Sequence, residues 1–569
     1  MAGNNHLLPK TYEDYCKLQA LQFYGYRHYG IHPHWDQDDI LRINGQWITH
    51  TIPRAGHPLI FSTPRKTWKQ KLYWFPKKQD EADLEAGENF SDVRTNNAAV
   101  RLRKAKDYFG EHPWFKFQKI LGYGGLGMAL HFKYNGTRDI AIKLSLSGWE
   151  ADSIREEEKM TKKMQRAAHC IQVIDPATVD ILNPRTYDPK PRLEDSSDEE
   201  ISSGDESIDE ARPPKRPRSE MTHEERAAKK ARWDERKQNW QLKRSQRLHK
   251  RADFMFLEYV PGGNLANFIN RLNNKQPERS TRIPNRVLWQ LWLCLVRACV
   301  GMKYPPRKFH PNRPKASNSG NAQQDLLEVV PPLSKRWRAK NIVHFDIDPS
   351  NIFIGNIDNE DYEQHDRLEY EHNFVPRLKL ADFGLAQDIK PHKRNEYYFW
   401  KRMNGKADFY TPEQFAPDWD KIPPKQHGAQ VGLQEIAGNY GSHTNVYGIA
   451  LVMWTIITQM RPPKPPQPQV PRGVTIPPGT HSIDYVLAKT TLNPHISYCP
   501  LLMDGGYDYI DIDLRRTIYE CMYHNPTHRP TVEDLLRQAQ HGVQRTYFGE
   551  SDTTIETFVS QYLLNADTE

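Results

Sequence analysis

Two stretches in the middle of the chain decide the fold: His344-Phe345-Asp346-Ile347-Asp348-Pro349-Ser350-Asn351 and, further along, Asp382-Phe383-Gly384. A short apolar run precedes each of them, NIV at 341–343 and LKLA at 378–381, so each polar stretch is predicted to follow a strand. Together they bring three carboxylates and an amide to the ends of two strands. A D-F-G triplet alone is a common turn, so its meaning depends on the rest of the chain.

A β pattern occupies the chain well before these stretches. FKFQKIL at 115–121, MALHFKY at 128–134 and DIAIKLSL at 139–146 predict three consecutive antiparallel strands, with a turn at Asn135-Gly136. A further short strand is predicted at 170–175 and another at 254–260, followed by an apolar helix around 287–296.

The first two strands are joined by the glycine-rich stretch Gly122-Tyr123-Gly124-Gly125-Leu126-Gly127. A plain hairpin turn would explain it. Glycines are also needed where backbone amides approach phosphate oxygens without obstruction by a Cβ. The strand–turn–strand context excludes the dinucleotide-binding form of G-x-G-x-x-G, which joins a strand to a helix.

The third strand carries Lys143. Alternation along a strand places Ala141 and Lys143 on the same face, beneath the glycine-rich loop. A small residue there leaves room for a flat ring, and the ammonium can meet phosphates. A lysine in a strand usually faces solvent, so a buried one needs an anionic partner.

The helix predicted at 149–168 offers three partners for this lysine, Glu156, Glu157 and Glu158. We expect Glu157, because apolar Met160 follows it at helical spacing. The choice among the three stays open at this point.

In this order and spacing, the motifs resemble those of the eukaryotic protein kinase superfamily over about residues 115–545, with two large insertions. The resemblance implies an α+β, bilobal protein-kinase-like fold with a small antiparallel-sheet N-lobe and a mainly helical C-lobe. It also implies ATP and Mg²⁺ as cofactors. Phosphoryl transfer needs a carboxylate that orients the attacking hydroxyl, and Asp346 matches it. It also needs oxygen ligands for magnesium, and Asn351 and Asp382 match those.

FLEYVPGGNL at 256–265 looks like the hinge of this family. The resemblance implies that Leu257 is the gatekeeper and that backbone groups of Glu258 and Val260 meet adenine. The residues implied to contact the nucleotide are Gly122, Gly124, Gly127, Ala141, Lys143, Glu258 and Val260.

The resemblance continues beyond the D-F-G triplet. GKADFYTPE at 405–413 is similar to the family stretch ending in A-P-E, and TNVYGIA at 444–450 looks like the start of the central C-lobe helix. The last stretch that carries the resemblance is CMYHNPTHRPT at 521–531. The resemblance also implies an ion pair between Glu413 and Arg529.

Phe345 departs from the family pattern, because it stands where an Arg normally receives an activation-loop phosphate. The segment from Leu385 to Phe409 contains no Ser or Thr, only Tyr397 and Tyr398. We therefore predict activity that does not depend on phosphorylation of this loop.

Three more positions depart from it. Asp348 replaces a Lys that lies near the γ-phosphate, and an anion there repels phosphate unless a cation screens it. Lys406 replaces a Thr, and we hypothesise that it supplies the cation lost at 348. Asn445 replaces an Asp that braces the catalytic loop, and its amide can still accept one hydrogen bond.

The composition shows where the chain is not core. Of 569 residues, 37% are hydrophobic, which is low for a globular protein, and 42 are prolines. The charged insertion at residues 176–250 accounts for much of this low hydrophobic content. Its acidic part, residues 194–210, is predicted to be disordered, and its basic part, residues 222–250, is predicted to form a solvated helix. The other units are an N-terminal extension of unknown role at 1–110, an insertion at 305–338, a proline tract at 461–472 and a C-terminal tail at 546–569.

The basic part of the insertion matches a bipartite nuclear localisation pattern: Lys215, Arg216, Lys229, Lys230 and Arg232. A solvated basic helix is the simpler interpretation and does not exclude a nuclear import receptor as partner. We expect a nuclear protein, with the cytoplasm as the alternative.

Five serines of the acidic part each have an acidic residue three positions later, which resembles sites for acidophilic kinases: Ser196, Ser197, Ser202, Ser203 and Ser207. Phosphate there would add negative charge beside the basic signal.

Other features of the chain predict a soluble intracellular protein. Six cysteines without a C-x-x-C pair fit a reducing compartment, and no signal peptide is evident at the start. The best apolar stretches, 287–302 and 446–457, are interrupted or too short to span a bilayer. Lys plus Arg exceed Asp plus Glu by only 79 − 71 = 8, which does not point to nucleic acid.

We therefore expect an ATP-dependent protein kinase directed to Ser/Thr, with the protein substrate unspecified. A pseudokinase scaffold acting through protein interactions is the alternative. A small-molecule phosphotransferase of related fold is disfavoured, because T-P-E at 411–413 and HRPT at 528–531 resemble the platform for protein substrates.

Overall fold

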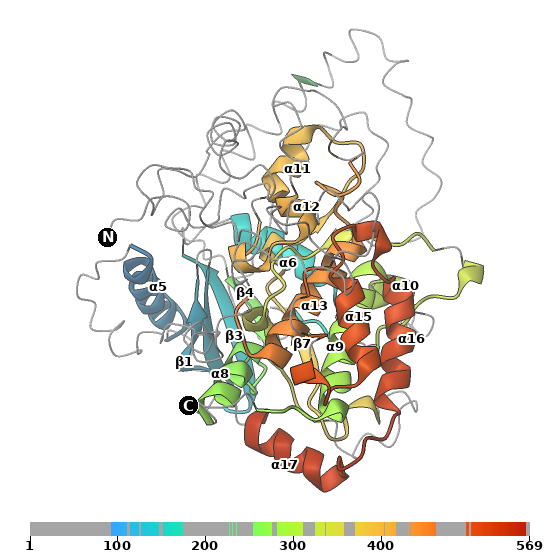
Figure 1. Ribbon diagram of the computed structural model, residues 1–569. Coiled ribbons are helices and arrows are strands. Elements are labelled where there is room, and N and C mark those ends of the chain that lie inside the picture. The colour runs from blue at the N-terminus through green and yellow to red at the C-terminus, as the bar shows by residue number, and fades with distance from the viewer. Residues whose placement is uncertain are drawn as a thin grey trace, which may run out of the picture.

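The protein, in this computed structural model, is α+β, with a four-stranded antiparallel sheet beside a larger part built mainly of helices (Figure 1). The structure describes residues 93–110, 114–124, 127–146, 152–174, 254–275, 281–310, 325–335, 337–357, 370–402, 404–416, 434–462 and 505–564, with a few residues at 227–235, 431, 497–499 and 502–503.

The sheet consists of β1 (Phe115–Tyr123), β2 (Gly127–Tyr134), β3 (Arg138–Ser145) and β4 (Phe254–Glu258), paired in that order. The three consecutive strands predicted from the sequence are confirmed. Between β2 and β3, Asn135 and Gly136 have φ values of 49° and 71°, as the two central residues of a type I′ turn require.

The prediction of a strand at 170–175 is wrong. Cys170 and Val173 form only isolated bridges, to Leu380 and Leu257. The chain here crosses from the helical part to the edge of the sheet, so its pairing partners change within a few residues and no ladder forms.

Helix α5 (Val93–Gly110) lies against the sheet (Figure 1). Its Phe109 is buried among Phe115, Phe132 and Phe254, with ring centroids 5.2, 5.1 and 5.0 Å away. Residues 1–110 show only weak hydrophobic periodicity, and the sequence assigns them no role; three of the five buried side chains described in this helix are alanines, which give little apolar signal. Burying such a ring stabilises the sheet by about 2 kcal/mol.

The core of the helical part is formed by α9 (Asn285–Lys303) and α13 (Ser442–Thr458), which are buried on almost every side. Around them lie α15 (Ile512–Cys521) and α16 (Val532–Val543). Gly542 of α16 lies directly on the ring of Trp289, where any Cβ would clash. No helix among the described residues is long and apolar enough to cross a membrane.

Two segments that sequence analysis had set apart contribute to this core. In the predicted tail, α17 (Asp552–Tyr562) packs on α8 (Leu265–Lys275), with the rings of Phe558 and Phe268 6.5 Å apart. In the insertion predicted at 305–338, α10 (Pro306–Phe309) forms a short helix and Glu328 is fully buried.

Residues 1–92 lie outside the described residues, and so do most of the charged insertion and most of the proline tract. The four insertion residues that are described, Ala227, Lys230, Ala231 and Glu235, are helical and exposed. Of the predicted import signal, only Lys230 is among them.

Candidate functional site

Two small antiparallel ladders hold the polar stretches next to each other. β5 (Ile342–Val343) pairs with β8 (Gln387–Asp388), and β6 (Ile352–Ile354) pairs with β7 (Leu378–Leu380). The loop 344–351 and the loop 381–386 therefore run side by side, and the N–H of Ala381 donates to the carbonyl of Asn351 at 2.9 Å. The two polar clusters seen in the sequence thus form one site.

Lys143 of β3 reaches this site from the sheet. Its Nζ donates to Glu157 Oε1 at 2.7 Å and to Asp382 Oδ1 at 2.8 Å. Burial alone would lower the pKa of Lys143, but the carboxylates of Asp382 and Glu157 outweigh burial and raise it. The ammonium is therefore charged and held between the sheet and the 381–386 loop.

Of the three candidate glutamates, Glu157 is the one that bonds to Lys143. It lies on α6 (Asp152–Lys163) with only 5% of its surface exposed, and burial raises the pKa of its carboxyl. Glu158 instead pairs with Lys162, one turn along the same helix, at 3.2 Å. Helical register decides which of the adjacent carboxylates faces the sheet.

Asp382 adopts a left-handed backbone conformation with φ of 61°, which turns its side chain toward Lys143. Its side chain is 42% exposed. Burial works to raise the pKa of Asp382, yet the Lys143 ammonium lowers it overall. This carboxylate is therefore ionised, and part of it is open to a ligand.

Asp346 and Asn351 face each other across the 344–351 loop. Asn351 Nδ2 donates to the Asp346 carbonyl and to Asp346 Oδ2, both at 2.9 Å. Asp346 Oδ1 is buried and has no hydrogen-bond partner in the described part of the chain. Burial and the neighbouring Asp348 raise the pKa of Asp346 to about 7, although Lys406 opposes the rise. Such an orphaned acceptor is rare in folded proteins and points to a ligand.

Asp348 is fully buried and pairs with Lys406, whose Nζ lies 2.5 Å from Asp348 Oδ2 and 2.6 Å from Ser350 Oγ. Asp348 also caps the 3₁₀ turn Pro349–Asn351 by accepting from the Ser350 N–H at 2.8 Å. Burial tends to lower the pKa of Lys406, but Asp348 raises it overall. The negative charge at 348 is thus compensated by a cation from another segment.

The loop is braced from beneath by α13. Asn445 Oδ1 accepts from the His344 N–H at 2.9 Å, and its Nδ2 donates to the Ile342 carbonyl at 2.7 Å. His344 Nε2 donates to the Ala381 carbonyl at 3.0 Å, and burial lowers the pKa of this imidazole to about 4. Asn445 uses both ends of its amide, where a carboxylate could only accept.

Phe345 has φ of 65° and points into an apolar cluster rather than toward solvent. Its ring lies 5.0 Å from that of Tyr440, edge to face, and the cluster also contains Tyr398 and Ile389. Gly405, with φ of 97°, lies so close to the Phe345 carbonyl that a Cβ would clash. An apolar contact therefore joins the loop to the segment after β8.

Glu413 and Arg529 form a fully buried bidentate pair, with Nη1–Oε1 at 2.8 Å and Nη2–Oε2 at 2.9 Å. Glu413 belongs to α12 (Pro412–Phe415) and Arg529 follows the 3₁₀ turn Pro526–His528. The Arg529 guanidinium lowers the pKa of Glu413 despite burial, which alone would raise it. The ion pair implied in the sequence is present.

The predicted glycine-rich loop lies beside Lys143. Gly122 pairs with Ala129 in the sheet, and the Gly124 N–H donates to the Gly127 carbonyl at 2.9 Å. A Cβ on Gly127 would lie 3.3 Å from Lys143 Cε, so a larger residue would crowd this lysine. Residues 125 and 126, at the tip, lie outside the described residues.

Of the predicted hinge residues, Leu257 and Glu258 end β4 and Val260 lies just beyond it. Ala141 lies opposite Leu257 in the sheet register, and Val260 packs on the helical core. The Glu258 N–H donates to the Gln172 carbonyl at 3.0 Å, so this amide is already used. The Glu258 carboxylate accepts from Lys379 Nζ at 2.8 Å, a partner that the sequence did not indicate. Lys379 lies in β7, whose three residues are all buried, so its ammonium depends on this carboxylate.

No protein-family model matches the chain, and no curated protein matches it significantly. The geometry therefore carries the functional argument. It brings together a charged lysine, an ionised and partly open carboxylate, and a second carboxyl with an orphaned oxygen.

Proposed function

We propose that the protein is an ATP-dependent protein kinase of bilobal, kinase-like fold that transfers the γ-phosphate of ATP to a Ser/Thr hydroxyl. One observation carries the proposal: Lys143 bonds both Glu157 and Asp382, which are supplied by separate parts of the fold. Lys143 and Asp382 are 239 residues apart in sequence, and the fold brings both to the place where phosphoryl transfer needs a cation and a metal-binding carboxylate.

In this proposal Lys143 binds phosphate oxygens, and Glu157 with Asp382 holds its ammonium in position. Asp346 accepts a hydrogen bond from the substrate hydroxyl through Oδ1, the oxygen that has no partner in the described chain. A pKa of about 7 suits a carboxylate that takes up the hydroxyl proton near neutrality. Asn351 keeps Asp346 in this orientation.

The residues present fit a magnesium ion. Asn351 spends its Nδ2 on Asp346, which leaves Oδ1 as its ligand atom, and Asp382 has a partly exposed carboxylate. Both are the hard oxygen donors that Mg²⁺ prefers. When bound, the ion neutralises the charge of the phosphates.

Lys406 takes the role of the cation that is absent at position 348. Its ammonium lies between Asp348 and Ser350, and its side chain is 44% exposed, so it can reach a ligand as well. Lys406→Ala should raise the ATP Michaelis constant or lower turnover, and Lys406→Arg should retain most of the activity. Unchanged kinetics in Lys406→Ala would refute this role.

The apolar cluster around Phe345 supports activity without a phosphate switch. Tyr398 is buried in it, and its hydroxyl donates to the Lys390 carbonyl at 3.1 Å, so contacts already order this segment. Phosphatase treatment of the purified kinase should leave turnover unchanged. A large loss that follows dephosphorylation of 385–409 would contradict this part of the proposal.

The decisive experiment measures transfer of radiolabel from ATP, with Mg²⁺, by the purified full-length chain. Glu157→Gln should lower transfer strongly, whereas Glu158→Gln, the adjacent change on α6, should not. Asp346→Asn should abolish the signal. Equal transfer by Asp346→Asn and the native chain would exclude this enzyme and leave a scaffold that acts through protein interactions.

A further inference from the structure

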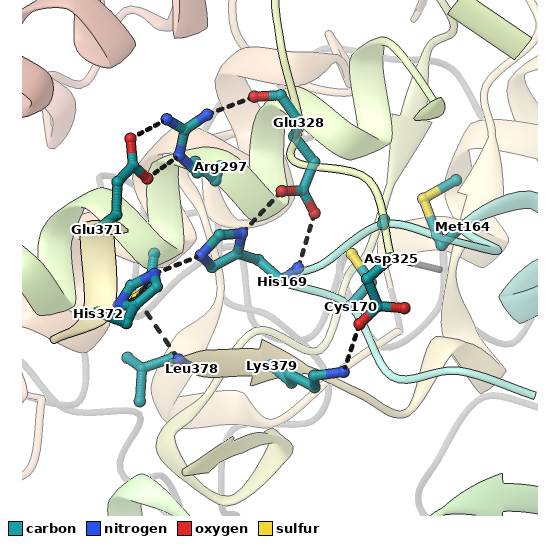
Figure 2. Close-up of polar contacts among 12 residues, drawn as sticks. Met164, His169, Cys170, Arg297, Asp325, Glu328, Glu371, His372, Leu378 and Lys379 are labelled. Atoms are coloured by element: carbon teal, nitrogen blue, oxygen red, sulfur yellow. Dashed lines mark hydrogen bonds and ion pairs between the residues drawn. The ribbon is translucent and has the colours of Figure 1, made fainter. Parts of the chain in front are cut away.

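A second polar cluster lies inside the helical part, and the proposed transfer reaction does not use it. It joins His169, from the turn after α6, with Cys294 of α9 and His372 of the 3₁₀ turn Tyr370–His372. Figure 2 shows the two histidines side by side. His169 and His372 are 0% exposed and Cys294 is 1% exposed. Three segments far apart in the sequence thus place imidazole and thiol groups together in a dry core.

The donor atoms of the three side chains converge. His169 Nε2 lies 3.1 Å from His372 Nε2, and Cys294 Sγ lies 3.9 Å from either nitrogen of His372. All three donor atoms are within 4.8 Å of one another. Two nitrogens bound tetrahedrally to one Zn²⁺-sized ion lie about 3.3 Å apart, and nitrogen and sulfur about 3.6 Å apart. Cys294 Sγ is equidistant from the two nitrogens of His372 and so lies on neither lone-pair axis; binding therefore requires the Cys294 side chain to turn toward Nε2.

The surrounding residues have the positions that outer-shell partners of a metal take. Glu328 Oε2 lies 2.7 Å from His169 Nδ1, so it fixes the tautomer that leaves a lone pair on Nε2. The N–H of Leu378 points at Cys294 Sγ at 3.5 Å, a contact that favours a thiolate. Figure 2 shows that Arg297 donates both to the Glu371 carboxylate and to the Glu328 carbonyl. The second bond fixes the backbone of Glu328 and so helps to position its carboxylate beside His169.

We propose that His169, Cys294 and His372 form a buried structural site for one soft transition-metal ion, Cu⁺ or Zn²⁺. Thiolate and imidazole donors select these ions over Mg²⁺ or Ca²⁺, which prefer oxygen. The ion enters during folding, because the finished core is closed. The ion joins the turn after α6 to α9 and to the segment before β7. β7 in turn leads into the 381–386 loop of the candidate functional site.

The protonation changes on binding balance. The Cys294 S–H bond breaks, a sulfur–metal bond forms, and the proton leaves to solvent. The ring of His372 also bonds the backbone of Val375, and a ring proton used there leaves the other nitrogen with a lone pair for the metal. Because binding releases the thiol proton, metal affinity falls as the pH is lowered.

The test is the metal content of the full-length chain after refolding with Zn²⁺ or Cu⁺ and removal of loosely held metal by a weak chelator. Elemental analysis should find equimolar metal in the native chain and identify which ion is retained. Cys294→Ser and His372→Gln should lose it. Cys299→Ser should keep it, because Cys299 is equally buried on the same helix but outside the cluster.

X-ray absorption at the metal edge of the native chain gives a second measurement that does not depend on the folding of variants. It should show imidazole nitrogens and one sulfur around the ion. A native chain that takes up no metal, metal retained at full content in both Cys294→Ser and His372→Gln, or a metal shell without sulfur would each overturn the proposal. In those cases the cluster is a hydrogen-bonded core network.

Discussion

Asp346 should destabilise the folded protein at neutral pH, and its removal should reveal this cost. The carboxyl is buried, one of its oxygens has no partner in the described chain, and Asp348 lies two residues away. The change Asp346→Asn keeps the shape of the side chain and removes the charge. We expect the variant to gain stability over the native chain as pH rises.

The sign and size follow from the pKa of Asp346, which is raised from 3.8 to about 7 on folding. Between these values the folded chain holds a proton that the unfolded chain has released, so the stability contributed by Asp346 falls as pH rises. Each pKa unit corresponds to about 1.36 kcal/mol, which gives a difference on the order of 4 kcal/mol across the window. Above about pH 7 the difference should level off.

Urea denaturation of both chains at a series of pH values from 4 to 8 measures this difference, since other titrating groups are common to the two proteins. Asp552→Asn is the control, because that side chain is 63% exposed and should give a much weaker dependence. A difference between native chain and Asp346→Asn that stays within about 1 kcal/mol over the whole range would refute the reasoning. This test does not require enzymatic activity.

Three further substitutions test the contacts that support the site. Arg529→Met should lower the free energy of unfolding by about 3 to 5 kcal/mol, because Glu413 is left buried without a counter-charge; a loss below about 1 kcal/mol in denaturant titration would contradict this. Asn445→Asp should cost about 3 kcal/mol, since a carboxylate cannot donate to the Ile342 carbonyl, and an unchanged melting temperature would argue against the brace. Phe345→Arg should expose the segment after β8 to limited proteolysis, because a guanidinium does not fit the apolar cluster, and native-like resistance would count against that packing.

Much of the candidate site was visible in the sequence, because its members lie in patterns with a local cause. Strand alternation placed Lys143 on an inner face, and helical spacing favoured Glu157 over its neighbours. The helix α5 was missed because its buried face is mostly alanine, and the Lys379 partner of Glu258 was missed because it comes from a distant strand.

The sequence by itself determined the local structure: the three-strand pattern at 115–146, the positive φ values at Asn135-Gly136 and the apolar helix at 287–296. These depend on side chains within a few residues of one another. Tertiary structure alone decided contacts that no local pattern indicates, as in those of Lys379 with Glu258 and of His169 with His372. Such pairs lie far apart along the chain, and only packing of the sheet and helices brings them within bonding distance. Burial then sets their pKa values, because desolvation depends on what surrounds a group in space.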